Sequence, residues 1–72
     1  MTTPRIRLVP IGIDTWRVVH DDLGPIGQVR AGWDEQGEHY AVKRFHPRDR
    51  RFHVLGRFWN KDDAIDALVL ST

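Results

Sequence analysis

The sequence predicts an α+β fold: an antiparallel sheet of three to five strands with one C-terminal helix packed on one face. Apolar and polar residues alternate over several short stretches, and turn-forming Gly, Pro, Asp and Asn residues separate these stretches. Such alternation is typical of antiparallel strands that bury one face. One stretch with helical spacing of its apolar residues follows near the C-terminus. Because a short helix is marginal by itself, we expect it to pack on the sheet.

The first two strands are expected at residues 5–9 and 16–20. Ile6 and Leu8 alternate with arginines in the first strand, and Trp16 begins a similar alternation in the second. A loop rich in turn-forming residues joins the two strands, so they are predicted to form a hairpin.

Three further strands are expected at residues 26–33, 39–45 and 52–58. The last two are rich in β-branched and aromatic side chains, which favour a pleated sheet. Pro47 ends the second of the three strands because it has no N–H to donate to the ladder. Gly56 lies within the last strand and indicates a β-bulge or a close approach of the helix.

The helix is expected to begin after Asn60, which is a favourable N-cap residue. Asp63 follows at the spacing of a capping box and also suits the positive end of the helix dipole. Ala64, Ile65 and Leu68 then form one apolar stripe. This stripe is the surface that we expect to contact the sheet.

At 72 residues the chain has room for one domain with a small core. We expect residues 1–72 to form that domain, with residues 1–20 as an additional N-terminal hairpin and residues 26–70 as the sheet–helix unit. The chain has no cysteine and no apolar run of the roughly 18 residues that a membrane helix needs. Its N-terminal residues lack the features of a signal peptide. These features predict a cytoplasmic protein that does not contact a membrane.

Basic residues gather near the middle of the second half of the chain, although the formal net charge is only +1. Residues 43–57 contain a single acid, Asp49, while most other acids occupy the earlier turns and the predicted helix. If the basic side chains share a face, they would neutralise several phosphates of a nucleic acid. The candidate nucleic-acid-binding residues are Lys43, Arg44, Arg48, Arg50, Arg51 and Arg57.

Two functions are compatible with this basic stretch. The first is a small DNA-binding or regulatory accessory domain that contacts double-stranded DNA through the sheet face and the hairpin, with Lys43 as the contact to base edges. The second is a protein-interaction module or a small homodimeric phage or bacterial regulator, which pairs through an exposed sheet edge without binding nucleic acid. Solvated basic side chains also protect sheet edges from aggregation. The sequence leaves these alternatives open.

The side chains of this sequence do not indicate a catalytic site or a metal site. The only serine, Ser71, lies at the C-terminal end with no base beside it. His39, His46 and His53 recur at an interval that fits neither helical nor strand spacing of metal ligands. We therefore expect no enzymatic activity, no metal site and no cofactor.

The aromatic side chains are too many for the core of so small a domain. We expect either Trp33 or Trp59 to be partly exposed. For Trp59 the favoured interpretation is that it packs against the start of the helix, and for Trp16 that it fills the core. Exposed aromatic side chains beside arginine can stack on bases or anchor a protein interface.

Residues 26–68 resemble a known architecture. The matching features are a strand that leads into Pro47, a basic hairpin, the run Leu55-Gly56-x-Phe58 and a helix with Asp63-Ala64-x-x-Ala67. This pattern resembles the three-stranded-sheet-plus-helix DNA-binding domains of plant ethylene-response factors and is similar to the arm-binding domains of phage tyrosine integrases. The resemblance implies that a small alanine lets the helix lie close to the sheet. It also implies that the outer sheet face enters the major groove of DNA.

Overall fold

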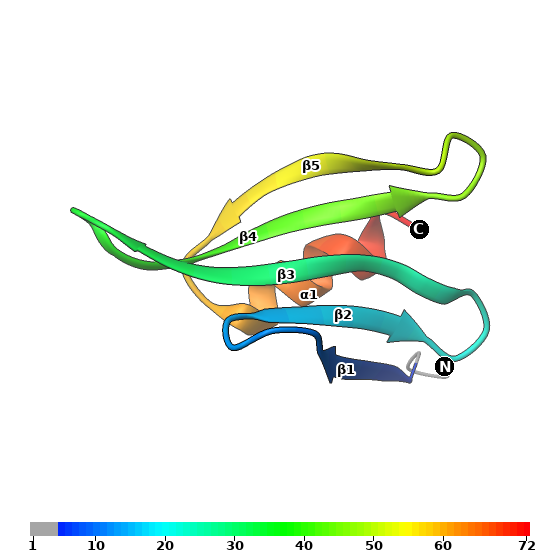
Figure 1. Cartoon of the computed structure of the whole chain (residues 1–72), viewed down its shortest axis with the longest axis horizontal. Helices are drawn as coiled ribbons and strands as arrows, with labels where there is room; N and C mark the ends of the chain where they lie inside the picture. Colours follow the sequence, from blue (N-terminus) through cyan, green and yellow to red (C-terminus); the bar gives the residue numbers. More distant parts are fainter. Residues whose placement is uncertain (1–4) are drawn as a thin grey trace.

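The computed structural model describes residues 5–72 and contains one sheet and one helix (Figure 1). The elements are β1 (Ile6–Pro10), β2 (Thr15–His20), β3 (Gly24–Asp34), β4 (Gly37–His46), β5 (Arg51–Phe58) and α1 (Lys61–Leu70). All neighbouring strands are antiparallel, and the strand order is β1-β2-β3-β4-β5. α1 lies behind the sheet in Figure 1 and covers one face, so the predicted fold class is confirmed.

Residues 1–4 lie outside the described part of the chain, and with them the start of the segment in which we expect no signal peptide. No helix within residues 5–72 is long and apolar enough to cross a membrane.

The N-terminal hairpin continues the sheet. β2 pairs with β3 from Thr15 opposite Arg30 to His20 opposite Gly24, and β1 pairs with β2. The hairpin of residues 1–20, as far as it is described, therefore extends the sheet sideways. It leaves the face opposite α1 uncovered (Figure 1).

The core lies between the sheet and α1. Its buried side chains are Val18, Ile26, Val29, Val42, Ala64 and Leu68. Ala64 and Leu68 belong to the predicted apolar stripe, and Ile65 packs against the core while half-buried. A Cβ atom at Gly27 would lie 2.9 Å from the Cδ1 atom of Leu68 and still closer to the carbonyl oxygen of Lys43. The absence of a side chain at Gly27 thus allows the helix to pack closely against β3.

Two irregularities interrupt the register between neighbouring strands. In β3, Ile26 has no partner because Val18 is opposite Gly27 and Val19 is opposite Pro25, and the Ile26 side chain enters the core. In β5 a second shift lies beside Gly56, whose φ of 146° is one that other residues rarely adopt. Of the two alternatives expected at Gly56, the structure has the β-bulge and not the close approach of the helix, because a Cβ atom there would meet nothing within 4 Å.

The start of α1 is capped as the sequence predicts. The side-chain oxygen of Asn60 accepts a hydrogen bond of 2.8 Å from the backbone N–H of Asp63. The Asn60 amide donates in turn to the Asp63 carboxylate at 2.9 Å. The first of these bonds satisfies a backbone donor that the first helical turn leaves without a partner.

The tryptophans mostly lie outside the core. Trp33 and Trp59 are 77% and 63% exposed, so both of them face solvent and the packing of Trp59 against the helix start is a wrong prediction. Trp16 is half-buried, and the Nζ atom of Lys61 lies 4.5 Å from the centre of its ring. Trp16 thus lies beside Lys61 at the start of α1 and does not fill the core.

Leu68→Ala should lower the free energy of unfolding by about 2–5 kcal/mol, because it leaves a cavity where α1 meets β3. Urea denaturation followed by circular dichroism measures this change. Leu70→Ala removes the same atoms from a side chain that is 86% exposed and should change stability by no more than about 0.5 kcal/mol. Equal unfolding midpoints for the two variants would contradict the docking of α1.

Candidate nucleic-acid interface

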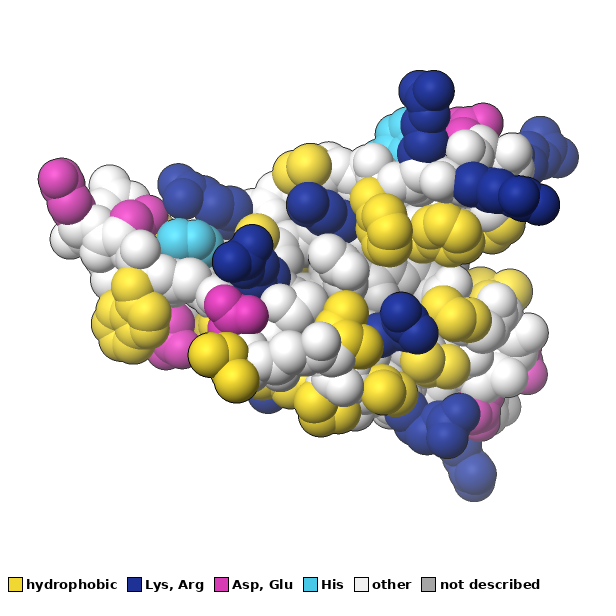
Figure 2. All heavy atoms as spheres, viewed as in Figure 1, with side chains coloured by type: hydrophobic (Ala, Val, Ile, Leu, Met, Phe, Trp, Pro, Cys, Tyr) yellow, Lys and Arg dark blue, Asp and Glu magenta, His cyan; other side chains and the backbone are white. Residues whose placement is uncertain are grey.

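The candidate interface is the open face, which we define as the surface of β2–β5 turned away from α1. Val18, Val29 and Val42 point toward the helix and are fully buried. Because successive side chains of a strand alternate between faces, residues next to these valines point away from the helix. The open face is the near face in Figures 1 and 2.

Each of the strands β2–β5 contributes one cation to the open face. These residues are Arg17, Arg30, Lys43 and Arg57. Arg17 and Lys43 share one row across the sheet, with Gln28 between them, and Arg30 and Arg57 share the next row, with Ala41 between them. Strand spacing separates the two cations of a row by about 10 Å, and the rows lie about 7 Å apart. Figure 2 shows basic side chains distributed across this surface.

Two carboxylates at one end of the open face partly neutralise it. Asp14 lies 3.5 Å from Nε of Arg30, and Asp34 lies 3.3 Å from an Nη atom of Arg57. The other two cations of the face, Arg17 and Lys43, form no ion pair within residues 5–72. The unpaired positive charge is therefore concentrated in the row that contains Gln28.

The acids of the helix lie on the opposite side of the molecule. Asp62, Asp63 and Asp66 are exposed on α1, behind the sheet in Figure 1. Three exposed acids of α1 thus lie on the side of the molecule opposite the four cations of the open face.

The six candidate residues named from the sequence do not share one face. Lys43 and Arg57 lie on the open face, and Arg48 and Arg50 lie in the exposed turn between β4 and β5. Arg51 is opposite His46, and by strand alternation it belongs to the side of α1.

Arg44 has a structural contact at the far end of α1. It is opposite Gly27 on the covered face, and its guanidinium donates a hydrogen bond to the carbonyl oxygen of Ser71. The last turn of α1 contains no basic residue. Arg44 therefore supplies from β4 the positive charge that suits the negative end of the helix dipole.

Two cations of the open face, Arg17 and Arg30, were missed because they lie outside the basic stretch of the sequence. A signal for them was present. Arg17 stands between Trp16 and Val18, and Arg30 follows Val29, so alternation alone places each arginine on the face away from the core.

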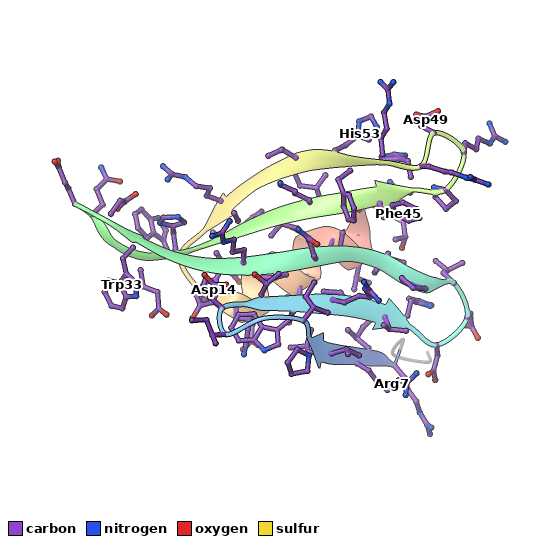
Figure 3. The ribbon with its side chains drawn as sticks, in the orientation of Figure 1. Arg7, Asp14, Trp33, Phe45, Asp49 and His53 are labelled. Atoms are coloured by element: carbon purple, nitrogen blue, oxygen red, sulfur yellow. The ribbon has the colours of Figure 1, made fainter. Side chains whose placement is uncertain are left out.

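An apolar recess adjoins the row of unpaired cations. Phe45 on β4 is opposite Phe52 on β5, with ring centres 5.3 Å apart and an angle of 49° between the rings. These rings line a shallow depression of about 250 Å³ together with Pro25, Gly27, Gln28 and Arg17. Phe45 is labelled in Figure 3, and Figure 2 shows hydrophobic side chains around a hollow in this part of the open face.

The histidines are distributed among separate contacts. Nδ1 of His39 lies 3.5 Å from the Asp34 carboxylate, at the end of the open face that carries the acids. The rings of His46 and His53 pack edge to face at 4.1 Å, and His53 also lies 3.8 Å from Asp49. No group of three His, Cys, Asp or Glu residues in the described chain is arranged to hold a metal ion.

Comparison with known proteins adds no relative: no family model, no curated protein and no solved structure matches this chain. The interpretation of the open face therefore depends on its own geometry and charge.

Arg44→Met should lower the free energy of unfolding by about 1–2 kcal/mol, because it removes a charge-assisted hydrogen bond to the end of α1 while keeping much of the side-chain volume. Thermal or urea denaturation measures the change. Arg48→Met, in the exposed turn, is the matched control and should alter stability by no more than about 0.5 kcal/mol. If both variants unfold at the same midpoint, the contact with Ser71 does not stabilise the helix.

The pKa of Tyr40 is raised above 10.0, mainly because its hydroxyl donates a hydrogen bond of 2.9 Å to Glu38, with smaller contributions from burial and from the Glu38 charge. Since the folded state favours the neutral phenol, this contact stabilises the fold below pH 10.0 and is lost as the pH rises through the higher folded pKa. Glu38→Gln should move the pKa of this single tyrosine back toward 10.0. Ultraviolet absorbance of the tyrosinate follows the titration of Tyr40 in the wild type and in the variant. Identical midpoints would show that Glu38 does not raise the pKa of Tyr40.

Proposed function

We propose that this chain is a small DNA-binding domain that contacts DNA through its open face. The observation that best supports the proposal is the presence of one cation from each of β2–β5 on the side opposite the acidic helix. Cations that neutralise phosphates release condensed counterions, and this release supplies much of the affinity of DNA-binding proteins.

The cations of the open face have two environments. Arg17 and Lys43 can contact phosphates without first leaving a carboxylate, since neither forms an ion pair within residues 5–72. Arg30 and Arg57 are 69% and 60% exposed, so they exchange weak surface ion pairs for phosphates. Gln28, between Arg17 and Lys43, has a side-chain amide that suits the edge of a base. Lys43 remains a candidate for the same role.

The turn between β4 and β5 extends the positive surface beyond the sheet. Arg48 and Arg50 are exposed there and are suited to additional phosphate contacts. The open face is also the surface that the resemblance to ethylene-response-factor and integrase domains assigns to DNA. A domain of this size and charge fits a regulatory accessory role, and its lack of cysteine fits the reducing cytoplasm.

A second candidate function is protein interaction through the free edge of β5. Phe52, Val54 and Leu55 are exposed on this edge strand, which is a surface that a partner strand can extend. The same strand carries Arg51 and Arg57, so antiparallel pairing with a second copy would bring like charges together. The edge therefore suits an acidic partner better than a homodimer.

The double variant Arg17→Ala, Lys43→Ala should bind DNA of every sequence more weakly than the wild type and with a flatter salt dependence. Each lost phosphate contact should reduce the log–log slope by about 0.7–0.9, so the double variant should lose about 1.4–1.8. Fluorescence anisotropy over a series of salt concentrations, with labelled duplex and single-stranded oligonucleotides, measures both quantities.

The matched control is Arg51→Ala, which removes a cation from the same molecule without changing the open face. Arg51→Ala should bind DNA with nearly the affinity of the wild type, whereas the single variant Arg17→Ala should bind more weakly. Absence of binding to any DNA by the wild-type chain at low salt would overturn the proposal. A larger loss from Arg51→Ala than from Arg17→Ala would overturn the assignment to the open face.

A further inference from the structure

The recess lined by Pro25, Phe45 and Phe52 is an unusual feature of a solvent-facing sheet surface. Phe52 is 51% exposed: Phe45 packs against one side of its ring, the helix lies on the other side of the sheet, and the rest of the ring faces solvent. The recess opens toward the same side as Arg17 and Lys43. An occupant must therefore combine an apolar, flat part with negative charge close by.

From these observations we infer that the recess binds an unstacked base of single-stranded DNA, so that the open face prefers a single strand to a duplex. This inference rests on the proposed function and specifies its substrate. Aromatic side chains on a basic surface bind single strands because every base presents a flat π-face. Phe45 and Phe52 supply the apolar surface for the base, and the two unpaired cations supply contacts for its flanking phosphates.

The rim of the recess suits the polar edge of a base. Gln28 and Arg17 line it, and neither side chain forms a hydrogen bond or ion pair within residues 5–72. An amide offers both a donor and an acceptor, while a guanidinium offers donors only. A base that stacks on Phe52 would thus find hydrogen-bonding partners at its edge.

The width of the sheet also favours a single strand. The four strands of the open face span about 14 Å from β2 to β5, whereas the major groove of B-DNA is about 12 Å wide. The whole open face therefore does not enter the groove, and in an intact duplex the faces of the bases are covered by their stacked neighbours. A single strand has neither restriction, because it can lie across the rows and turn one base into the recess.

Other occupants fit the surface less well. A second copy of this chain would bring the cations of two open faces together, which costs free energy. A thymine methyl group of a duplex would fill only a small part of a recess of about 250 Å³. A single-stranded segment matches both the apolar recess and the surrounding positive charge.

The test compares wild type and Phe52→Ala on three probes of equal length: an oligothymidine of about ten nucleotides, an abasic strand with the same phosphates, and a duplex. Wild type should bind the oligothymidine at least about fivefold more tightly than the abasic strand or the duplex. Phe52→Ala should weaken binding to the oligothymidine by about five- to 150-fold and leave binding to the abasic strand nearly unchanged. Fluorescence anisotropy measures all six affinities.

Two further variants separate a binding role from a structural one. Phe52→Trp keeps an aromatic face and should retain the preference for the oligothymidine. Leu70→Ala shortens an exposed side chain of α1, on the other side of the sheet, and should bind all three probes as the wild type does.

The outcomes distinguish this inference from the proposed function. Binding of the duplex as tightly as the oligothymidine would overturn the inference while leaving the DNA-binding proposal intact. If Phe52→Ala weakened binding to the oligothymidine and to the abasic strand equally, the inference would also be overturned, because the contribution of the ring to affinity would not depend on a base. Absence of binding to all three probes at low salt would overturn both proposals.

Discussion

The contact between Leu68 and the backbone of β3 at Gly27 is the constraint on which the rest of the structure depends. α1 has only ten residues, so it covers one face of a five-stranded sheet and no more. Leu68 and Ala64 bury the valines of the central strands because Gly27 leaves room for the Leu68 side chain. With all of the core on that side, the other face must remain in water. A solvent-facing sheet of this extent is therefore a direct consequence of how the helix docks.

Alternation along each strand then separates the charges that the sequence mixes. Lys43 and Arg44 are neighbours in the chain, yet Lys43 faces solvent while Arg44 reaches the end of α1 and contacts Ser71. The arginines consequently have two physical roles: Arg44 contacts the end of α1, while Arg17, Arg30 and Arg57 contribute to a positive surface. Net charge by itself does not reveal such a surface, because the ten acids of the chain, three of them on α1, nearly cancel its positive charge in the sum.

The open face combines this positive charge with an exposed aromatic ring, that of Phe52. Leaving Phe52 half-exposed gives up part of the stabilisation that burial of a phenyl ring provides. In a domain with only a few fully buried side chains, that loss is considerable. Ligand binding on the open face would offset it, since a stacked base would cover the ring.

Local patterns in the sequence determined much of this protein: the α+β class, the strands, the cap at Asn60, the bulge at Gly56 and the apolar stripe that ends in Leu68 are all present. These features depend on neighbouring residues, so spacing along the chain is enough to find them. Alternation indicates the face to which a cation of one strand points, but only the tertiary structure decided which cations lie side by side across the strands. Arg17 and Arg30 join Lys43 and Arg57 through pairing between strands, while Arg44 and Arg51 turn to the other side. Register across a sheet relates residues that are distant in the sequence, and it is set by the helix that buries one face and by the bulges that shift the pairing.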